Sequence, residues 1–142
     1  MYNRGMTALD RGQIADFGAS LGRCHATPGF IARFYELFVA ASPEAAEKFK
    51  DTDLERQNLA MSSSLYALIL VIEGGKAAIL YLDKIARQHG REDLDIRPEL
   101  YDVWLECLIE TVSEFDPQYS DEIERLWRDA MAFGVEFMQS RY

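Results

Sequence analysis

Cysteine, histidine and proline are scarce in this sequence, which has two, two and four of them among its 142 residues. The two cysteines, Cys24 and Cys107, form neither a Cys-x-x-Cys pair nor a zinc-type spacing with histidine, so we expect reduced, buried thiols. No apolar signal core follows Met1, and the longest apolar run, residues 65–72, is too short to span a bilayer. We therefore expect a cytoplasmic protein without a membrane segment.

Positive charge is scarce as well. Lysine and arginine number 15 against 24 aspartates and glutamates, which gives a net charge of −9 and a pI near 4.7. A surface of this sign repels nucleic-acid phosphates and anionic lipids, so we expect neither as a partner. The composition, 49% hydrophobic and 27% charged, is that of a globular protein, and the length fits a single domain over residues 1–142.

Strand-forming residues are few, because valine and threonine are far outnumbered by alanine, leucine and glutamate, and this balance favours an all-α fold. Start signals such as Ser42-Pro43 and breaks such as Gly74-Gly75 divide the chain into six long helices and one short helix. The expected helices cover about residues 7–24, a segment that starts at 27–28, then 42–49, a segment from 51–53 to the glycine pair, 77–89, 98–115 and 120–139.

The two histidines have different settings. His89 shares one predicted helix face with Leu82, Ile85 and Ala86, so it points into the core. This pattern alone leaves two interpretations, a core histidine bonded to a backbone carbonyl or a metal ligand. His25 stands at the end of the first predicted helix, where we expect a surface or capping role.

Four stretches resemble parts of the globin family, and they occur in the globin order with matching gaps. They are residues 34–38 with 42–49 (FYELF and SPEAAEKF), 84–89 (KIARQH), 96–101 (IRPELY), and 125–130 (RLWRDA) with Gly134 and Phe137. They are similar to the globin B and C helices, the end of helix F, the start of helix G, and helix H. The branch they resemble contains the bacterial single-domain haemoglobins and the globin domain of flavohaemoglobins. The resemblance implies a globin fold, a three-over-three helical sandwich around a haem.

The resemblance also implies the site. It makes His89 the proximal iron ligand, which outweighs the core interpretation, and it makes Tyr35 and Gln57 a distal pair. Gln57 and His89 are 32 residues apart, as in that branch. The cofactor would be a non-covalent haem b, since no Cys-x-x-Cys-His motif is present. Met61 falls one turn after Gln57 on the ligand side.

Other aromatic residues complete the implied site and the core. The resemblance places the Phe49 ring on the porphyrin and makes Tyr101 the proximal tyrosine. For Tyr35 and Phe49 the alternative is ordinary core packing; for Gln57 it is a solvent-facing position. Met61 is expected to pack and not to bind iron. The aromatic residues expected in the core are Phe34, Phe38, Trp104, Trp127, Phe133 and Phe137.

The function implied is reversible binding of dioxygen, carbon monoxide and nitric oxide, with Tyr35 and Gln57 donating hydrogen bonds to bound dioxygen. A nitric oxide dioxygenase, a haem-based gas sensor and a haem-free partner-binding domain are the alternatives. The dioxygenase would need a separate electron-donating reductase, because these residues contain no flavin or nicotinamide domain. The late glutamate of helix H would also fall after Tyr142. We therefore expect a gas-binding protein, not an enzyme, and leave monomer or homodimer open.

Overall fold

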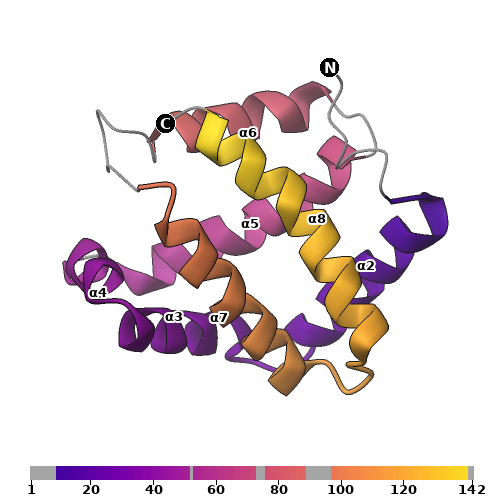
Figure 1. The fold of residues 1–142 in the computed structure, drawn as a ribbon, viewed down its shortest axis with the longest axis horizontal. Coiled ribbons are helices and arrows are strands. Elements are labelled where there is room, and N and C mark those ends of the chain that lie inside the picture. The colour runs from indigo at the N-terminus through magenta and orange to yellow at the C-terminus, as the bar shows by residue number, and fades with distance from the viewer. Residues whose placement is uncertain (1–8, 52, 73–75, 89–96, 141–142) are drawn as a thin grey trace.

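The computed structural model describes residues 9–51, 53–72, 76–88 and 97–140, and these residues contain seven helices and no strand. The helices, labelled in Figure 1, are α2 (Arg11–His25), α3 (Phe30–Ala41), α4 (Pro43–Phe49), α5 (Leu54–Ile72), α6 (Lys76–Gln88), α7 (Leu100–Phe115) and α8 (Asp121–Ser140). The all-α expectation is confirmed. Within the described ranges, no helix combines the length and the apolar character that a membrane crossing requires.

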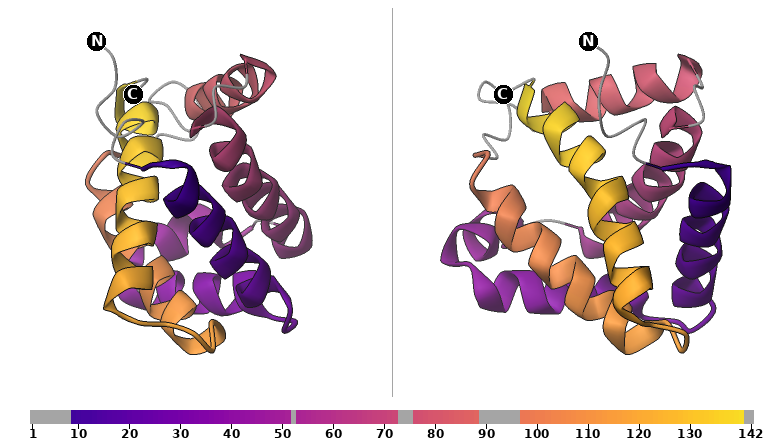
Figure 2. Two further views of the ribbon diagram at one scale, coloured as in Figure 1. Left: turned by 90° about the vertical axis from the view of Figure 1, so that its right-hand side faces the viewer. Right: turned by 45° about the vertical axis from the view of Figure 1, so that its right-hand side comes forward.

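The helices pack in two overlapping groups. The α3 helix packs against α7 and α4, whereas α8 packs against α2, α7 and α6. The α5 helix contacts both α3 and α6, which lie at opposite ends of the molecule (Figure 2). The α5 helix therefore links the end that carries Tyr35 to the end that carries α6.

Three helices begin later than the sequence predicts: α2, α3, and α7, which starts at Leu100 and not near residue 98. Asp10 accepts a hydrogen bond from the Gln13 backbone nitrogen (2.8 Å) and donates its own backbone N–H to the Gln13 side chain (2.9 Å). This capping box fixes the start of α2 at Arg11, so the expected start near residue 7 is wrong. The expected start at residues 27–28 is also wrong, because Gly29 adopts φ 98° and α3 begins after it.

Other boundaries are confirmed. The Ser42 hydroxyl accepts a hydrogen bond from the Ala45 backbone nitrogen (3.1 Å), and Pro43 takes the first position of α4. The Asp53 carboxylate caps α5 in the same way, accepting from the backbone of Glu55 at 3.1 Å. The chain becomes extended at Asp116, as expected before a proline, and ends α7.

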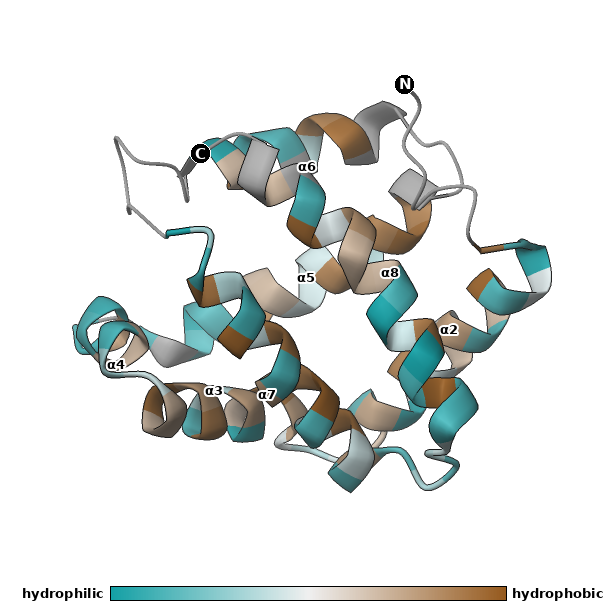
Figure 3. Cartoon of the chain, viewed as in Figure 1, coloured by the Kyte–Doolittle hydropathy of each residue, from teal (hydrophilic) through white to brown (hydrophobic). Residues whose placement is uncertain are grey.

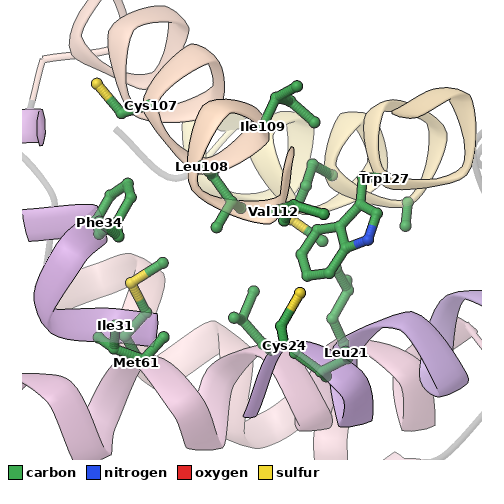
Figure 4. Packing of buried hydrophobic residues seen from close by; sticks show 14 of the residues in the cluster. Leu21, Cys24, Ile31, Phe34, Met61, Cys107, Leu108, Ile109, Val112 and Trp127 are labelled. Carbon is green, nitrogen blue, oxygen red and sulfur yellow. The ribbon is translucent and has the colours of Figure 1, made fainter. Parts of the chain in front are cut away.

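The core lies where α2, α3, α5, α7 and α8 meet, and Figure 4 shows part of it. Trp127 is fully buried, and its ring makes an edge contact with Phe17 at 4.8 Å between centroids. Phe34, Phe38, Trp127 and Phe133 are buried as expected, while Trp104 is half-buried and the Phe137 side chain lies outside the described residues. Cys24 and Cys107 are buried free thiols, as predicted.

A buried polar network ties α2 to the end of α7 and to α8. The Trp127 indole donates to the Ser20 hydroxyl (2.8 Å), which donates to the Asp116 carboxylate (2.6 Å). The Arg23 guanidinium donates two more bonds to Asp116, at 2.6 and 3.0 Å. Burial raises the pKa of Asp116, but the bonds from Arg23, Ser20 and the Gln118 backbone outweigh it and lower the pKa below its usual value.

Candidate functional site

The structure brings together the two residues of the implied distal pair. Tyr35 lies on α3 and is 5% exposed, and Gln57 lies half-buried on the first turn of α5. The Gln57 amide Nε2 donates a hydrogen bond to the Tyr35 hydroxyl oxygen at 3.0 Å. Gln57 holds this position because the Asp53 cap sets the register of α5 and the Asp53 carbonyl accepts from the Gln57 backbone (3.0 Å).

The Tyr35 hydroxyl is half-satisfied. Its oxygen accepts from Gln57, but its hydrogen has no acceptor in the part of the chain that the structure describes. Burial raises the pKa of Tyr35 to about 12, against a smaller lowering effect of the Gln57 bond. The phenol therefore keeps its proton at neutral pH and can donate a hydrogen bond to a ligand.

An incompletely covered phenylalanine stands beside this pair. The Phe49 ring, at the end of α4, lies 5.2 Å from the Tyr35 ring and 6.0 Å from the Phe38 ring, measured between centroids. Tyr35 and Phe38 are buried, whereas Phe49 is half-buried. Phe49 thus leaves part of an aromatic surface for a flat apolar group.

Met61 and Leu65 extend the apolar lining along α5. They follow Gln57 by one and two helical turns and are 6% and 3% exposed. Figure 4 shows Met61 in the same region of the core as Ile31 and Phe34. One face of α5 therefore carries a single polar group, Gln57, followed by buried apolar side chains.

The proximal half of the implied site is described in part. Tyr101, near the start of α7, is 8% exposed, and burial raises its pKa to about 12. On α6, Ala86 is buried and Ile85 is half-buried, as expected for the face assigned to His89. His89 itself lies outside the described residues, so its predicted ligand role stays a prediction. Within the described ranges, no cluster of three or more histidine, cysteine or acidic side chains could hold a metal ion.

Two contacts near these residues were not predicted from the sequence. The Arg97 guanidinium donates two hydrogen bonds to Glu44 on α4, at 2.6 and 3.0 Å, and so joins the helix that ends at Phe49 to the segment before Tyr101. The sequence signal that could have predicted this ion pair is the opposite charge of Glu44 and Arg97, which lie in two of the globin-like stretches. His25, expected in a surface or capping role, is half-buried in the last turn of α2, and its ring contacts Phe30 at 5.1 Å and Tyr66 at 5.6 Å between centroids.

A comparison with solved structures identifies a similar protein. The crystal structure of protein PA3967 from Pseudomonas aeruginosa PAO1, described as structurally highly homologous to a human hemoglobin, superposes with a TM-score of 0.86. The two sequences are 35% identical, and the match covers 92% of this chain and 98% of that chain. No protein-family model and no curated protein matches this sequence. The identity and coverage show that the chain belongs to the family of this haemoglobin-like protein and has a globin fold.

Proposed function

We propose that this globin binds a haem b without a covalent link and, through it, reversibly binds dioxygen and other diatomic gases, including carbon monoxide and nitric oxide. The observation that carries the proposal is the buried Tyr35 hydroxyl, whose oxygen is hydrogen-bonded and whose proton has no acceptor among the described residues. A buried hydroxyl without an acceptor for its proton becomes fully hydrogen-bonded when a polar ligand binds beside it. Membership in a haemoglobin-like family supports the same conclusion.

The described residues fit a haem on the distal side. Phe49 offers a partly exposed ring, and Met61 and Leu65 offer buried apolar surface, as a porphyrin requires. We assign the iron ligand to His89, and Tyr101 would line the proximal side of the haem site. A haem held by these residues supplies the iron at which a gas molecule binds.

The chain's own residues would control how long the gas stays. Gln57 holds the Tyr35 oxygen, so the tyrosine is a positioned donor and Gln57 is first a positioning residue. This differs from the sequence-based expectation that both side chains donate to the gas. The rings of Phe34 and Phe49 pack against the Tyr35 ring, at 4.9 and 5.2 Å between centroids, and so reduce water around the tyrosine and strengthen its hydrogen bond to a polar ligand.

The absorption spectrum tests this proposal. Chain reconstituted with haem should show a Soret band that shifts after addition of dithionite and carbon monoxide. His89→Ala should lose stable haem binding, and because haem stabilises the folded state, this variant should also melt at a lower temperature. His25→Ala, which removes the other histidine, should leave the spectrum unchanged.

Two outcomes would contradict the proposal. A reconstituted wild-type chain without a Soret band or a carbon monoxide shift would exclude a gas-binding haem. Normal haem affinity in His89→Ala would keep the haem but require a different axial ligand.

A further inference from the structure

Trp104 lies in the middle of the inward-facing side of α7 and yet is only half-buried. It follows Tyr101 by three residues and precedes Leu108 and Thr111 by four and seven, so the four side chains share one helix face. Tyr101 is 8% exposed, and Leu108 and Thr111 are fully buried. Figure 3 shows brown segments alternating with teal ones along α7, as expected for a helix with one side in the core. Exposure in the middle of that side means that the packing around Trp104 is incomplete.

The two tryptophans of this chain differ in their hydrogen bonding. Trp127 is fully buried, and its indole N–H donates to the Ser20 hydroxyl at 2.8 Å. The Trp104 indole N–H has no acceptor among the described residues, and its nitrogen is not fully buried. A buried tryptophan normally finds an acceptor for its N–H. Trp104 therefore keeps a free and accessible donor on the side of α7 that faces the core.

One aromatic ring connects Trp104 to the implied distal pair. The Phe34 ring, which is fully buried, lies 4.9 Å from the Tyr35 ring and 6.0 Å from the Trp104 ring, measured between centroids. The Tyr35 hydroxyl also keeps a proton without an acceptor in the described part of the chain. The α3 and α7 helices thus each bring one unsatisfied, neutral donor to the same group of aromatic side chains.

We propose that Trp104 is a second hydrogen-bond donor on the distal side of the haem site, where its indole N–H and the Tyr35 hydroxyl bind the same polar ligand. This inference rests on the proposed function. Dioxygen gains negative charge when it binds a haem iron, whereas carbon monoxide gains little, so an added donor stabilises bound dioxygen selectively. The sequence pattern predicts Trp104 in the core, but its incomplete burial assigns it to the ligand site.

Tryptophan is well suited to this role. Its ring nitrogen is a donor only, so unlike an amide it presents no oxygen that would repel a negatively charged ligand. Its side chain has two rotatable bonds, and the contact with Phe34 orders it. The donor is therefore in place before the ligand arrives, and little conformational entropy is lost on binding.

The indole signals in a proton–nitrogen NMR spectrum of the haem-loaded protein test the assignment. The chain contains two tryptophans, so Trp104→Phe identifies both signals. The carbon monoxide and dioxygen forms are both diamagnetic and can be compared directly. We expect the Trp104 signal to move downfield in the dioxygen form, because an N–H that donates a hydrogen bond is deshielded. The Trp127 signal should stay in place, since Ser20 accepts its hydrogen bond.

Dissociation rates measure the effect on the ligand. Trp104→Phe keeps an aromatic ring beside Phe34 but removes the donor, so it should speed dioxygen release by about tenfold and change carbon monoxide release much less. Trp127→Phe is the matched control, because it removes the other indole N–H. It should lower the melting temperature and leave both rates unchanged.

Three outcomes would overturn this inference and leave the proposed function intact. They are a haem-loaded chain whose Trp104 signal is the same in both gas forms, unchanged dioxygen release in Trp104→Phe, and equal acceleration of both gases, which would show that the indole acts by its size. A wild-type chain without a Soret band would instead contradict the proposed function itself, and this inference with it.

Discussion

A buried tyrosine hydroxyl without an acceptor for its proton costs the folded protein about 1–3 kcal/mol, unless a ligand completes its hydrogen bonding. Tyr35 is in this state within the described residues, with Gln57 bonded to its oxygen and the rings of Phe34 and Phe49 packed against its own ring. Ordinary core packing does not require a polar pair here. The pair is explained if Tyr35 is reserved for a polar molecule that enters the pocket.

Tyr35→Phe in the haem-loaded protein should speed dioxygen dissociation by about 10- to 100-fold. The estimate follows because a hydrogen bond to a charged group contributes about 1.5–3 kcal/mol, and each 1.4 kcal/mol is a factor of ten. Gln57→Leu should act in the same direction with a smaller effect, since it removes the positioning bond and leaves the donor. Stopped-flow dissociation rates measure both.

Carbon monoxide and a distant tyrosine provide the controls. Carbon monoxide gains little charge on binding, so its release should change much less in Tyr35→Phe. Tyr119→Phe removes a hydroxyl that bonds to Glu124 between α7 and α8, and it should leave both rates unchanged. Equal acceleration of both gases in Tyr35→Phe would instead show that the phenol acts by its size.

That Tyr35 and Gln57 lie close together could be predicted from the sequence, but the hydrogen bond between them could not. Helical phase and the globin resemblance placed Tyr35 and Gln57, yet neither specifies rotamers, so the bond between them was not predicted. The same limit applies to His25. Its partners Phe30 and Tyr66 come from two other helices, and a local pattern contains no information about them.

At the scale of elements, helix starts were predicted where the cap and the first turn are adjacent in sequence, as at Ser42-Pro43 and Asp53. Thr27-Pro28 has the same local signal, but Gly29 adopts a left-handed conformation and moves the start of α3 to Phe30. The local sequence does not decide between the two adjacent signals, so the start of α3 could not be predicted from it.

The Asp116 network joins α2, α7 and α8, so Asp116→Asn should destabilise the protein by roughly 1.5–3 kcal/mol. The asparagine keeps the size of the side chain but removes the charge, and it presents an N–H group to donors such as Arg23 and Ser20. Urea unfolding should show a lower midpoint with an unchanged m-value.

Glu106→Gln is the control, because it removes the charge from an ion pair with Arg128 in which Glu106 is 65% exposed. Surface pairs of this kind contribute about 0–1 kcal/mol. Equal losses in both variants would show that the buried network contributes no more than a surface ion pair.

At the scale of the whole molecule, the pH dependence of stability separates into two ranges. The carboxylates of Asp116, Glu106 and Glu114 have lowered pKa values, so the stability they contribute is lost below pH 4.5, as pH falls through those values. Burial lowers the pKa of His25 from 6.5, and its Nε2 atom is buried without a hydrogen-bond partner among the described residues. His25 therefore acts in a higher and separate pH range.

His25→Gln should remove a loss of stability that the wild-type chain shows on mild acidification. Below pH 6.5 the unfolded chain protonates His25 more readily than the folded chain, because burial of the ring beside Phe30 and Tyr66 disfavours its charged form. The unfolded state then binds more protons, so the free energy of unfolding decreases as the pH is lowered, by at most about 1.4 kcal/mol per pH unit for one group. The loss stops once pH passes below the folded pKa.

Urea unfolding of both proteins from pH 7.5 to 5, in the same cofactor state, gives the difference directly. His89 and the carboxylates are present in both proteins, so their contributions to the pH dependence cancel in the difference. Parallel curves over this range would show that His25 protonates as readily in the folded protein as in the unfolded chain.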